Sequence, residues 1–527
     1  MDAMKLAAAA VLLLTASAGC ADLNVVNPNQ PERDQVVRTP NDIEKLVQGS
    51  YNSYWLATTH VNGVGPLLNA ASFHNSSMAA NFGQVERSAL PRTPVGNTPA
   101  DQFASQYEYT WDNIYRAIAG ANDGLRAIKG GVVIGTPSAN NTPRARAFGR
   151  FVQGLTHGTL ALLYDKAIVV PETFVYDAAK APGQQGLAPA PYPEVMAAAM
   201  AYLDSAIAVA SANTFTIPAD WMGTGTVSSA DLARLAYFYK ARFRALVART
   251  PQERAAVDWA RVISDLNASG TTTFNIGFDG GTKWYRYDLY QAQAYGAWGK
   301  VASQVYGMAD TSGTYQSYMA TPIALRKEIV IRTPDLRWPR GESETVQGAN
   351  PGSFIAYSPG GQSNADRGTW RFSNYVDRRG RSTDQNPLAA NYPEVTATEK
   401  NMLRAEALYR MGQLGPAADL INLTRVGVGG LPPVGASYSP TAPNCVPRLP
   451  NGQCGNFFEA FKYEWRMQSY FIGFGTWYFN SRGWGDLPQG SFLHLPIPAR
   501  DLQNFGLPVY TTGGGGEGST GVGTYGY

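Results

Sequence analysis

The chain has 527 residues, of which 44% are hydrophobic, 12% aromatic and only 16% charged, and its formal net charge is +3. This length allows a large buried core, divided among several domains or built as one large helical array. The balanced charge, without a cluster of Lys and Arg, gives little attraction for a phosphate backbone and argues against a nucleic-acid partner. A weakly charged surface rich in polar and aromatic side chains suits neutral ligands such as glycans.

The N-terminus predicts secretion and lipid anchoring. The apolar run Leu6–Leu14 is too short to cross a bilayer of about 30 Å as a helix, so residues 1–19 are interpreted as a signal peptide. Ala18-Gly19-Cys20 resembles the end of a bacterial lipobox, although Ser17 stands where Leu or Val is usual. We expect acylation of the cysteine, with residues 20–40 as a tether. The alternative is ordinary cleavage at the same place, which leaves a soluble protein.

Residues 41–269 are predicted to form a helical part. Periodicity begins at Asn41, which is expected to cap the first helix, and a long amphipathic segment follows at 101–129. Its apolar stripe is interpreted as core, since helix packing requires this spacing. Small residues where successive helices meet predict tetratricopeptide-like hairpins. The other helices are expected at residues 144–164, 193–210, 230–249, 251–267, 396–411 and 416–425.

Residues 270–395 interrupt this pattern with a long insertion rich in Gly, Pro, Ser, Asn and aromatic residues. Loops of this length in a compact protein are usually functional or disordered, and the aromatic content argues against disorder. A ring face buries roughly 150–250 Å² and stacks on the C–H face of a sugar without needing charge. Each ring has core packing as its alternative role. The ligand-binding candidates are Trp284, Tyr285, Trp298 and Trp370, with Arg371 as a hydroxyl donor.

Residues 396–510 are expected to hold the last hairpin, a closing helix at 457–479 and a terminal segment, before a flexible Gly-rich tail at 511–527. Cys445 and Cys454 are separated by a turn-rich stretch that allows them to meet. An oxidising compartment favours a disulfide between them. Closing so small a loop stabilises a protein by about 2–3 kcal/mol on the loop-entropy model.

No catalytic motif is visible in the sequence. The four histidines are dispersed without metal-ligand spacing, so neither a metal nor a cofactor is expected. Glu342 with Glu344, or Asp366 with Asp377, leaves a glycosidase pair as an alternative, since separation in space decides such a role. The chain is therefore predicted not to be an enzyme. A secreted or surface-anchored glycoside hydrolase and a repeat scaffold that binds only protein remain as alternatives.

Several segments together resemble the SusD/RagB-like family of outer-membrane lipoproteins, over nearly the whole chain and in the expected order. They are Leu23–Asn29, Trp111–Tyr115 with Ala121-Asn122, Leu403–Ala407, Glu464–Arg466 before Gly483–Leu487, and Leu495–Pro498. Phe471–Gly475 departs from the acidic-glycine-arginine run that is usual in the family at that point, which leaves the subfamily and its ligand open.

The resemblance implies a mainly α fold with about four tetratricopeptide-like pairs and long irregular loops that form a shallow site for an oligosaccharide or peptide. It also implies a cell-surface lipoprotein of the outer membrane that delivers its ligand to a SusC-like TonB-dependent β-barrel transporter. In the family, the loop between the first two helices often contributes ligand contacts. By position, the corresponding residues here are Phe73, His74, Asn75, Asn81, Phe82 and Arg87.

Overall fold

The computed structural model describes residues 39–77, 83–279, 283–284, 299–359, 373–379, 391–441, 444–469, 473–521 and 523. Helices dominate these residues, and the strands are short and pair two by two in antiparallel sheets. The predicted signal peptide and Cys20 lie outside the described residues.

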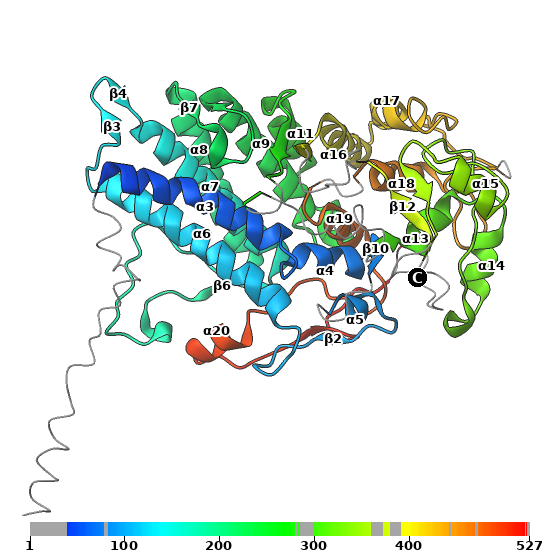
Figure 1. Cartoon of the computed structure of the whole chain (residues 1–527), viewed down its shortest axis with the longest axis horizontal. Helices are drawn as coiled ribbons and strands as arrows, with labels where there is room; N and C mark the ends of the chain where they lie inside the picture. The colour runs from blue at the N-terminus through cyan, green and yellow to red at the C-terminus, as the bar shows by residue number, and fades with distance from the viewer. Residues whose placement is uncertain are drawn as a thin grey trace, which may run out of the picture.

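Four pairs of packed helices form the scaffold, and each pair packs on the next in chain order (Figure 1). This arrangement is the predicted mainly α fold of tetratricopeptide-like hairpins. The pairs are α3 (Pro40–Thr59) with α6 (Ser105–Lys129), α7 (Thr142–Leu163) with α8 (Tyr192–Ala212), α9 (Ser229–Leu246) with α11 (Trp259–Ala268), and α16 (Ala397–Arg410) with α17 (Leu414–Arg425).

Side-chain caps set where several helices begin. The sequence predicted Asn41 as the cap of the first helix, but Thr39 has that role: its hydroxyl accepts from the Asp42 N–H at 3.2 Å, and Pro40 occupies the first helical position. Proline is favoured there because its missing N–H has no partner within the helix. Asp258 caps α11 in the same way, which divides the predicted helix at 251–267 into α10 (Pro251–Ala255) and α11.

Glycines in α7 allow its neighbours to approach closely. A Cβ added at Gly154 would lie 2.5 Å from Cγ of Leu203 in α8, and one added at Gly158 would overlap the ring of Phe243 in α9. Both positions are buried. A larger residue at either place would force α7 away from the helices on which it packs.

Helix α8 is, within the described residues, the helix that length and hydropathy alone would allow to cross a membrane. It packs between α7 and α9 and buries Val195, Ala199, Leu203, Ala206 and Ala210 against them. This spacing of three and four residues is that of a helix with one face in a protein core. The composition of α8 is thus explained by its place in the scaffold.

Short elements fill the connections between the paired helices. Between α3 and α6 lie α4 (Val64–Ala71), β1 (Asn75–Ser77), α5 (Gln84–Ser88) and β2 (Pro94–Val95). Later connections carry the hairpins β3 (Gly135–Thr136) with β4 (Ala139–Asn140), β5 (Lys166–Ile168) with β6 (Pro189–Pro191), and β7 (Thr216–Ile217) with β8 (Val227–Ser228).

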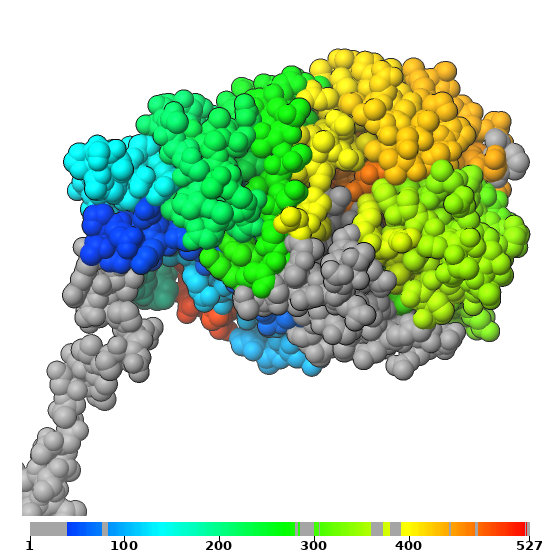
Figure 2. All heavy atoms as spheres, turned by 45° about the horizontal axis from the view of Figure 1, so that its top comes forward, coloured from blue at the N-terminus to red at the C-terminus, as the bar shows by residue number. Residues whose placement is uncertain are grey.

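The insertion forms a second hydrophobic core beside the scaffold. Tyr306, Trp338 and Tyr375 of the insertion are buried in it, together with Phe73 from the connection between α3 and α6. In Figure 2 the described part of the insertion, coloured yellow-green, lies against the last helical pair. Its elements are β9 (Phe274–Gly277), β10 (Gly299–Val301), α13 (Ser303–Tyr306), α14 (Thr314–Ala320), α15 (Glu344–Ala349), β11 (Ile355–Tyr357), β12 (Tyr375–Asp377) and β13 (Asn391–Val395).

The C-terminal part differs from the sequence prediction in two ways. The closing helix predicted at 457–479 consists of α18 (Phe457–Ser469) and α19 (Thr476–Trp484), and Gly475 at the start of α19 has φ of 59°. The predicted flexible tail also contains β14 (Thr512–Gly513), which pairs with β2 and is buried. The Ser519 carbonyl accepts from the Gly490 N–H at 2.8 Å, so this part of the tail is held against the protein.

Candidate functional site

A strand pair joins the two segments from which the sequence predicted ligand contacts. β1, from the connection between α3 and α6, pairs with β10, from the insertion, so that Asn75 lies opposite Val301 and Ser77 opposite Gly299. In Figure 1, β10 lies beside α4, the helix that leads into β1. Residues more than 200 positions apart are thus brought together.

Phe73 fixes the entry to this strand pair. Its ring is fully buried in the second core, and its φ of 50° lies in the left-handed region that bulky residues rarely adopt. The Arg92 guanidinium lies 4.8 Å from the ring centroid and donates to Ser491 Oγ at 3.0 Å. A strained backbone costs about 1–3 kcal/mol and persists only where its surroundings hold it in place. Phe73 therefore positions β1 from the core, and its predicted contact with a ligand remains a prediction.

His74 and Arg87 are buried as well. The His74 ring lies roughly parallel to that of Trp477, with centroids 6.5 Å apart. Arg87 donates to the Pro94 carbonyl at 3.3 Å, and burial lowers the pKa of its guanidinium. Both side chains support the connection between α3 and α6, and their contact with a ligand remains a prediction. Position in the sequence did not reveal this, because it does not show what covers a side chain.

Asn75 lies at the start of β1. Its side chain is buried at the start of β1, and its Oδ1 has no hydrogen-bond partner among the described residues. Buried polar atoms in native proteins nearly always have a partner. Asn75 Oδ1 is therefore a candidate acceptor for a ligand hydroxyl at the start of β1.

Trp284 is a core residue, contrary to the prediction. Its ring centroid lies 6.0 Å from that of Tyr51 and 6.5 Å from that of Trp55, both in α3. A Cβ added at Gly223 would come within 2.5 Å of the indole, so backbone covers it as well. Its backbone carbonyl accepts from the Asp279 N–H at 3.1 Å. The indole is therefore occupied by protein and anchors the insertion to the first helix.

The other candidates have no described position. Tyr285, Trp298, Trp370, Arg371, Asn81 and Phe82 lie outside the described residues, so their roles in binding remain predictions. Described elements that lie near them in sequence frame the candidate site: β1, β10 and the start of β12.

Hydrogen bonds tie that frame together within the insertion. Ser373 Oγ donates to the Val301 carbonyl at 2.6 Å, joining the segment before β12 to β10. Lys300 Nζ donates to the Ser358 carbonyl at 2.8 Å, joining β10 to the segment after β11. The hydroxyl of Tyr375 donates to Gln347 Oε1 at 2.7 Å. The ends of the described segments on the insertion side of the site are therefore fixed to one another.

Buried ion pairs attach the insertion to the scaffold. Arg337 donates to both carboxylate oxygens of Glu464 in α18, at 2.6 and 2.9 Å, and to Asp335 at 2.7 Å. All three side chains are fully buried. Tyr463 adds a hydroxyl that donates to Asp335 at 2.6 Å. Because the pairing is bidentate, it fixes orientation as well as distance between insertion and helix.

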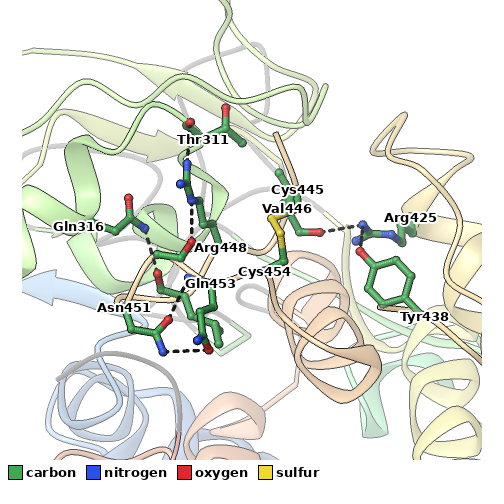
Figure 3. The surroundings of a disulfide bond; sticks show 12 residues. Thr311, Gln316, Arg425, Tyr438, Cys445, Val446, Arg448, Asn451, Gln453 and Cys454 are labelled. Carbon is green, nitrogen blue, oxygen red and sulfur yellow. Dashed lines mark hydrogen bonds between the residues drawn. A yellow bond between two sulfur atoms is a disulfide. The ribbon is translucent and has the colours of Figure 1, made fainter. Parts of the chain in front are cut away.

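The predicted disulfide between Cys445 and Cys454 is present (Figure 3). The loop it closes contacts both sides of the insertion's attachment. Arg448 donates to the Thr311 carbonyl at 3.1 Å, and the Val446 carbonyl accepts from Arg425 of α17 at 2.7 Å. The disulfide loop thus links the last helical pair to the insertion.

The groups considered for catalysis have structural partners where they are described. Glu342 is exposed and lies 3.0 Å from Arg332, whereas Asp377 is buried and lies 2.7 Å from Arg379. Glu344 is exposed in the first turn of α15, and Asp366 lies outside the described residues. Within the described ranges, no group of three or more His, Cys, Asp or Glu side chains is placed to hold a metal ion.

Together these features define a class: a helical-repeat scaffold with an anchored insertion, in which two distant segments frame a candidate site. No family model and no curated protein sequence matches the chain. Solved structures do match. A SusD superfamily protein from Bacteroides thetaiotaomicron VPI-5482 has a TM-score of 0.50 at 16% identity, covering 84% of this chain and 90% of its own.

Two further structures have similar scores. A SusD superfamily protein from Bacteroides vulgatus ATCC 8482 has a TM-score of 0.51 at 12% identity, covering 89% of this chain and 97% of its own. A SusD-like carbohydrate binding protein from Bacteroides fragilis NCTC 9343 has a TM-score of 0.52 at 13% identity, covering 85% and 86%. The chain therefore has the SusD-like fold over most of its length, as the sequence resemblance implied.

Proposed function

We propose that this chain is a cell-surface lipoprotein that binds a neutral oligosaccharide and delivers it to a SusC-like TonB-dependent β-barrel transporter of the outer membrane. The observation that carries the proposal is the β1–β10 pair, which joins the two segments predicted to hold the ligand. The SusD-like fold and the carbohydrate-binding description of one structure that shares it support the choice of ligand. In this proposal residues 1–19 are removed and residues 20–40 tether the acylated Cys20.

The proposed role is capture without chemistry. Tyr285, Trp298 and Trp370 supply ring faces for sugar C–H groups, while Arg371 and Asn75 supply a hydroxyl donor and acceptor. Delivery to a transporter requires release as well as binding, so dissociation constants between about 1 mM and 1 μM are expected. Product formation by the purified protein from a screened glycan would favour the hydrolase alternative instead.

Affinity electrophoresis in gels that contain a neutral polysaccharide tests the binding step. The native protein should be retarded by at least one polysaccharide of a panel, and Trp298→Ala or Trp370→Ala should reduce the retardation. Leu423→Ala is the matched control, because it removes an exposed apolar side chain from α17, away from the proposed site. Retardation that all three variants retain would contradict the residue assignment. No retardation by any glycan would contradict the ligand class.

The anchor and the partner require separate tests. Metabolic labelling with a radioactive fatty acid should mark the native protein and not Cys20→Ala, and the variant should leave the membrane fraction. Purification of the tagged lipoprotein from detergent-solubilised outer membranes should recover a large β-barrel protein. Recovery of the lipoprotein alone, under conditions in which it still binds glycan, would contradict delivery while leaving capture intact.

A further inference from the structure

Two adjoining cavities, each of about 320 Å³, follow one side of α6. They share a wall formed by Tyr115, Phe174 and Tyr176, and α20 (Ala499–Asn504) closes the first cavity with Asp501. None of these residues belongs to the β1–β10 pair, and in Figure 1 α20 and β10 lie on opposite sides of α4. The cavities are therefore distinct from the site described above.

A pinned loop forms the outer wall of these cavities. We call residues 169–187, between β5 and β6, the strap. Asn122 of α6 donates to one strap carbonyl at 2.9 Å, and Arg126 donates to two others at 2.9 and 2.5 Å. Gln185 closes the strap by bonding both the N–H and the carbonyl of Asp177, at 2.9 and 2.8 Å. A loop fixed in this way is preorganised and does not have to be ordered by a ligand.

The strap presents apolar side chains outward instead of burying them. Val175 is 61% exposed and Tyr176 is 54% exposed, while Phe174 and, across the cavity, Phe505 are half-buried. One exposed ring and two half-buried rings thus border the cavity, and exposed apolar side chains beside a concave site are typical of ligand binding.

The charges around the first cavity select the ligand's chemistry. Asp112 and Asp501 share one cation, Arg500, at 2.6 and 3.3 Å. Glu108 lies close enough for these carboxylates to act on it, and burial raises its pKa, as it does that of Asp501. Three carboxylates around one guanidinium disfavour an anion. The oxygens of Asp112 and Asp501, which line the cavity, accept hydrogen bonds from hydroxyl groups, and the rings there suit C–H faces.

We propose that this cavity between α6, the strap and α20 is a second carbohydrate-binding site, which holds one or two pyranose residues of a neutral glycan. Its volume is at the lower end of the range for small-molecule pockets, about 300–1,000 Å³, which limits the occupant to a short piece of the chain. The glycan class rests on the proposed function. With two sites on one protein, a long polysaccharide is retained more strongly than either site alone would retain it.

The test compares short and long glycans on matched variants. Tyr176→Ala and the double variant Tyr176→Ala/Phe505→Ala remove rings from this cavity, Trp370→Ala addresses the β1–β10 site, and Leu423→Ala is the control. Titrations with a short oligosaccharide, followed by saturation-transfer NMR, should show weakening of about tenfold at one of two sites for Tyr176→Ala. Gel retardation by the matching polysaccharide should fall in Tyr176→Ala and in Trp370→Ala, and further when the two are combined.

The outcomes separate this proposal from the proposed function. Sugar signals that Trp370→Ala abolishes while the double variant leaves them unchanged would overturn the second site and preserve capture at the first. If the double variant abolishes the sugar signals and Trp370→Ala does not, the result would support this cavity. It would also contradict the assignment of the main binding site to the β1–β10 pair. Absence of any glycan binding by the native protein would overturn both. Crystals soaked in the same oligosaccharide should show density against Tyr176, and an empty cavity with an occupied first site would refute the second.

Discussion

Replacing Arg337 by Met is expected to loosen the insertion from the scaffold. The guanidinium is fully buried and makes at least three hydrogen bonds to the carboxylates of Asp335 and Glu464. Without it, two carboxylates remain buried with no cation of comparable geometry; the Arg425 guanidinium lies 3.6 Å from Glu464. Breaking a buried pair from one side costs about 3–5 kcal/mol of unfolding free energy. That is a large part of the roughly 5–15 kcal/mol typical of a domain.

Urea unfolding followed by tryptophan fluorescence measures this loss, because Trp338 lies next to Arg337 in the chain and is fully buried. The matched control is Arg332→Met, which removes the same side chain from an exposed pair with Glu342 and should change stability by less than about 1 kcal/mol. Arg337→Lys keeps the charge but loses the bidentate fork, so it should fall between the two. Equal unfolding free energies for the Arg337→Met and Arg332→Met variants would refute the claim that this cluster holds the insertion.

Three further predictions address other parts of the molecule. Burial lowers the pKa of His157 to about 4, against about 6.5 in the unfolded chain. The stability that is present above pH 6.5 is therefore lost as the pH falls towards 4, by about 3 kcal/mol. His157→Gln should flatten that part of the plot of urea midpoint against pH. Cys445→Ser/Cys454→Ser should lower the unfolding free energy by about 2–3 kcal/mol and abolish the effect of a reductant, whereas a reductant effect that persists in the variant would contradict this assignment. Gly158→Ala should destabilise the protein by about 1–3 kcal/mol, because the added Cβ would overlap an α9 ring. Gly49→Ala should stabilise it by about 0.5–1 kcal/mol, because Gly49 is exposed in α3 with open space around it. Thermal shifts of the same sign for the two variants would refute the packing argument.

The scaffold was predictable from the sequence because helix pairs leave a local signal. Apolar residues recur at three- and four-residue steps, and small residues mark where two helices approach, as Gly154 and Gly158 do. Helix ends were less predictable. The break at Asp258 depends on one side chain that caps α11, and the periodic pattern on either side of it does not reveal the interruption.

The arrangement of the insertion was not predictable in the same way. Its contacts join residues far apart in sequence, such as Arg337 with Glu464 and Asn75 with Val301, and no periodic pattern records them. The disulfide was an exception, since a short turn-rich spacing between two cysteines is itself a local signal. The tail showed the opposite error: glycine content predicted flexibility, yet the backbone of Thr512–Gly513 pairs with β2.

Aromatic residues give the clearest reason why composition and spacing do not locate a binding surface. Trp284 lies in an irregular segment and was predicted to bind ligand, but α3 covers it. Tyr115 lies on the regular stripe of α6 and packs against the core as predicted, yet it also lines a cavity, because the strap that Asn122 and Arg126 fasten to this helix covers its face only in part. Periodicity shows which residues share a face of a helix, whereas what covers that face depends on distant segments. A site of this kind is thus formed from a core face that long-range hydrogen bonds leave partly open.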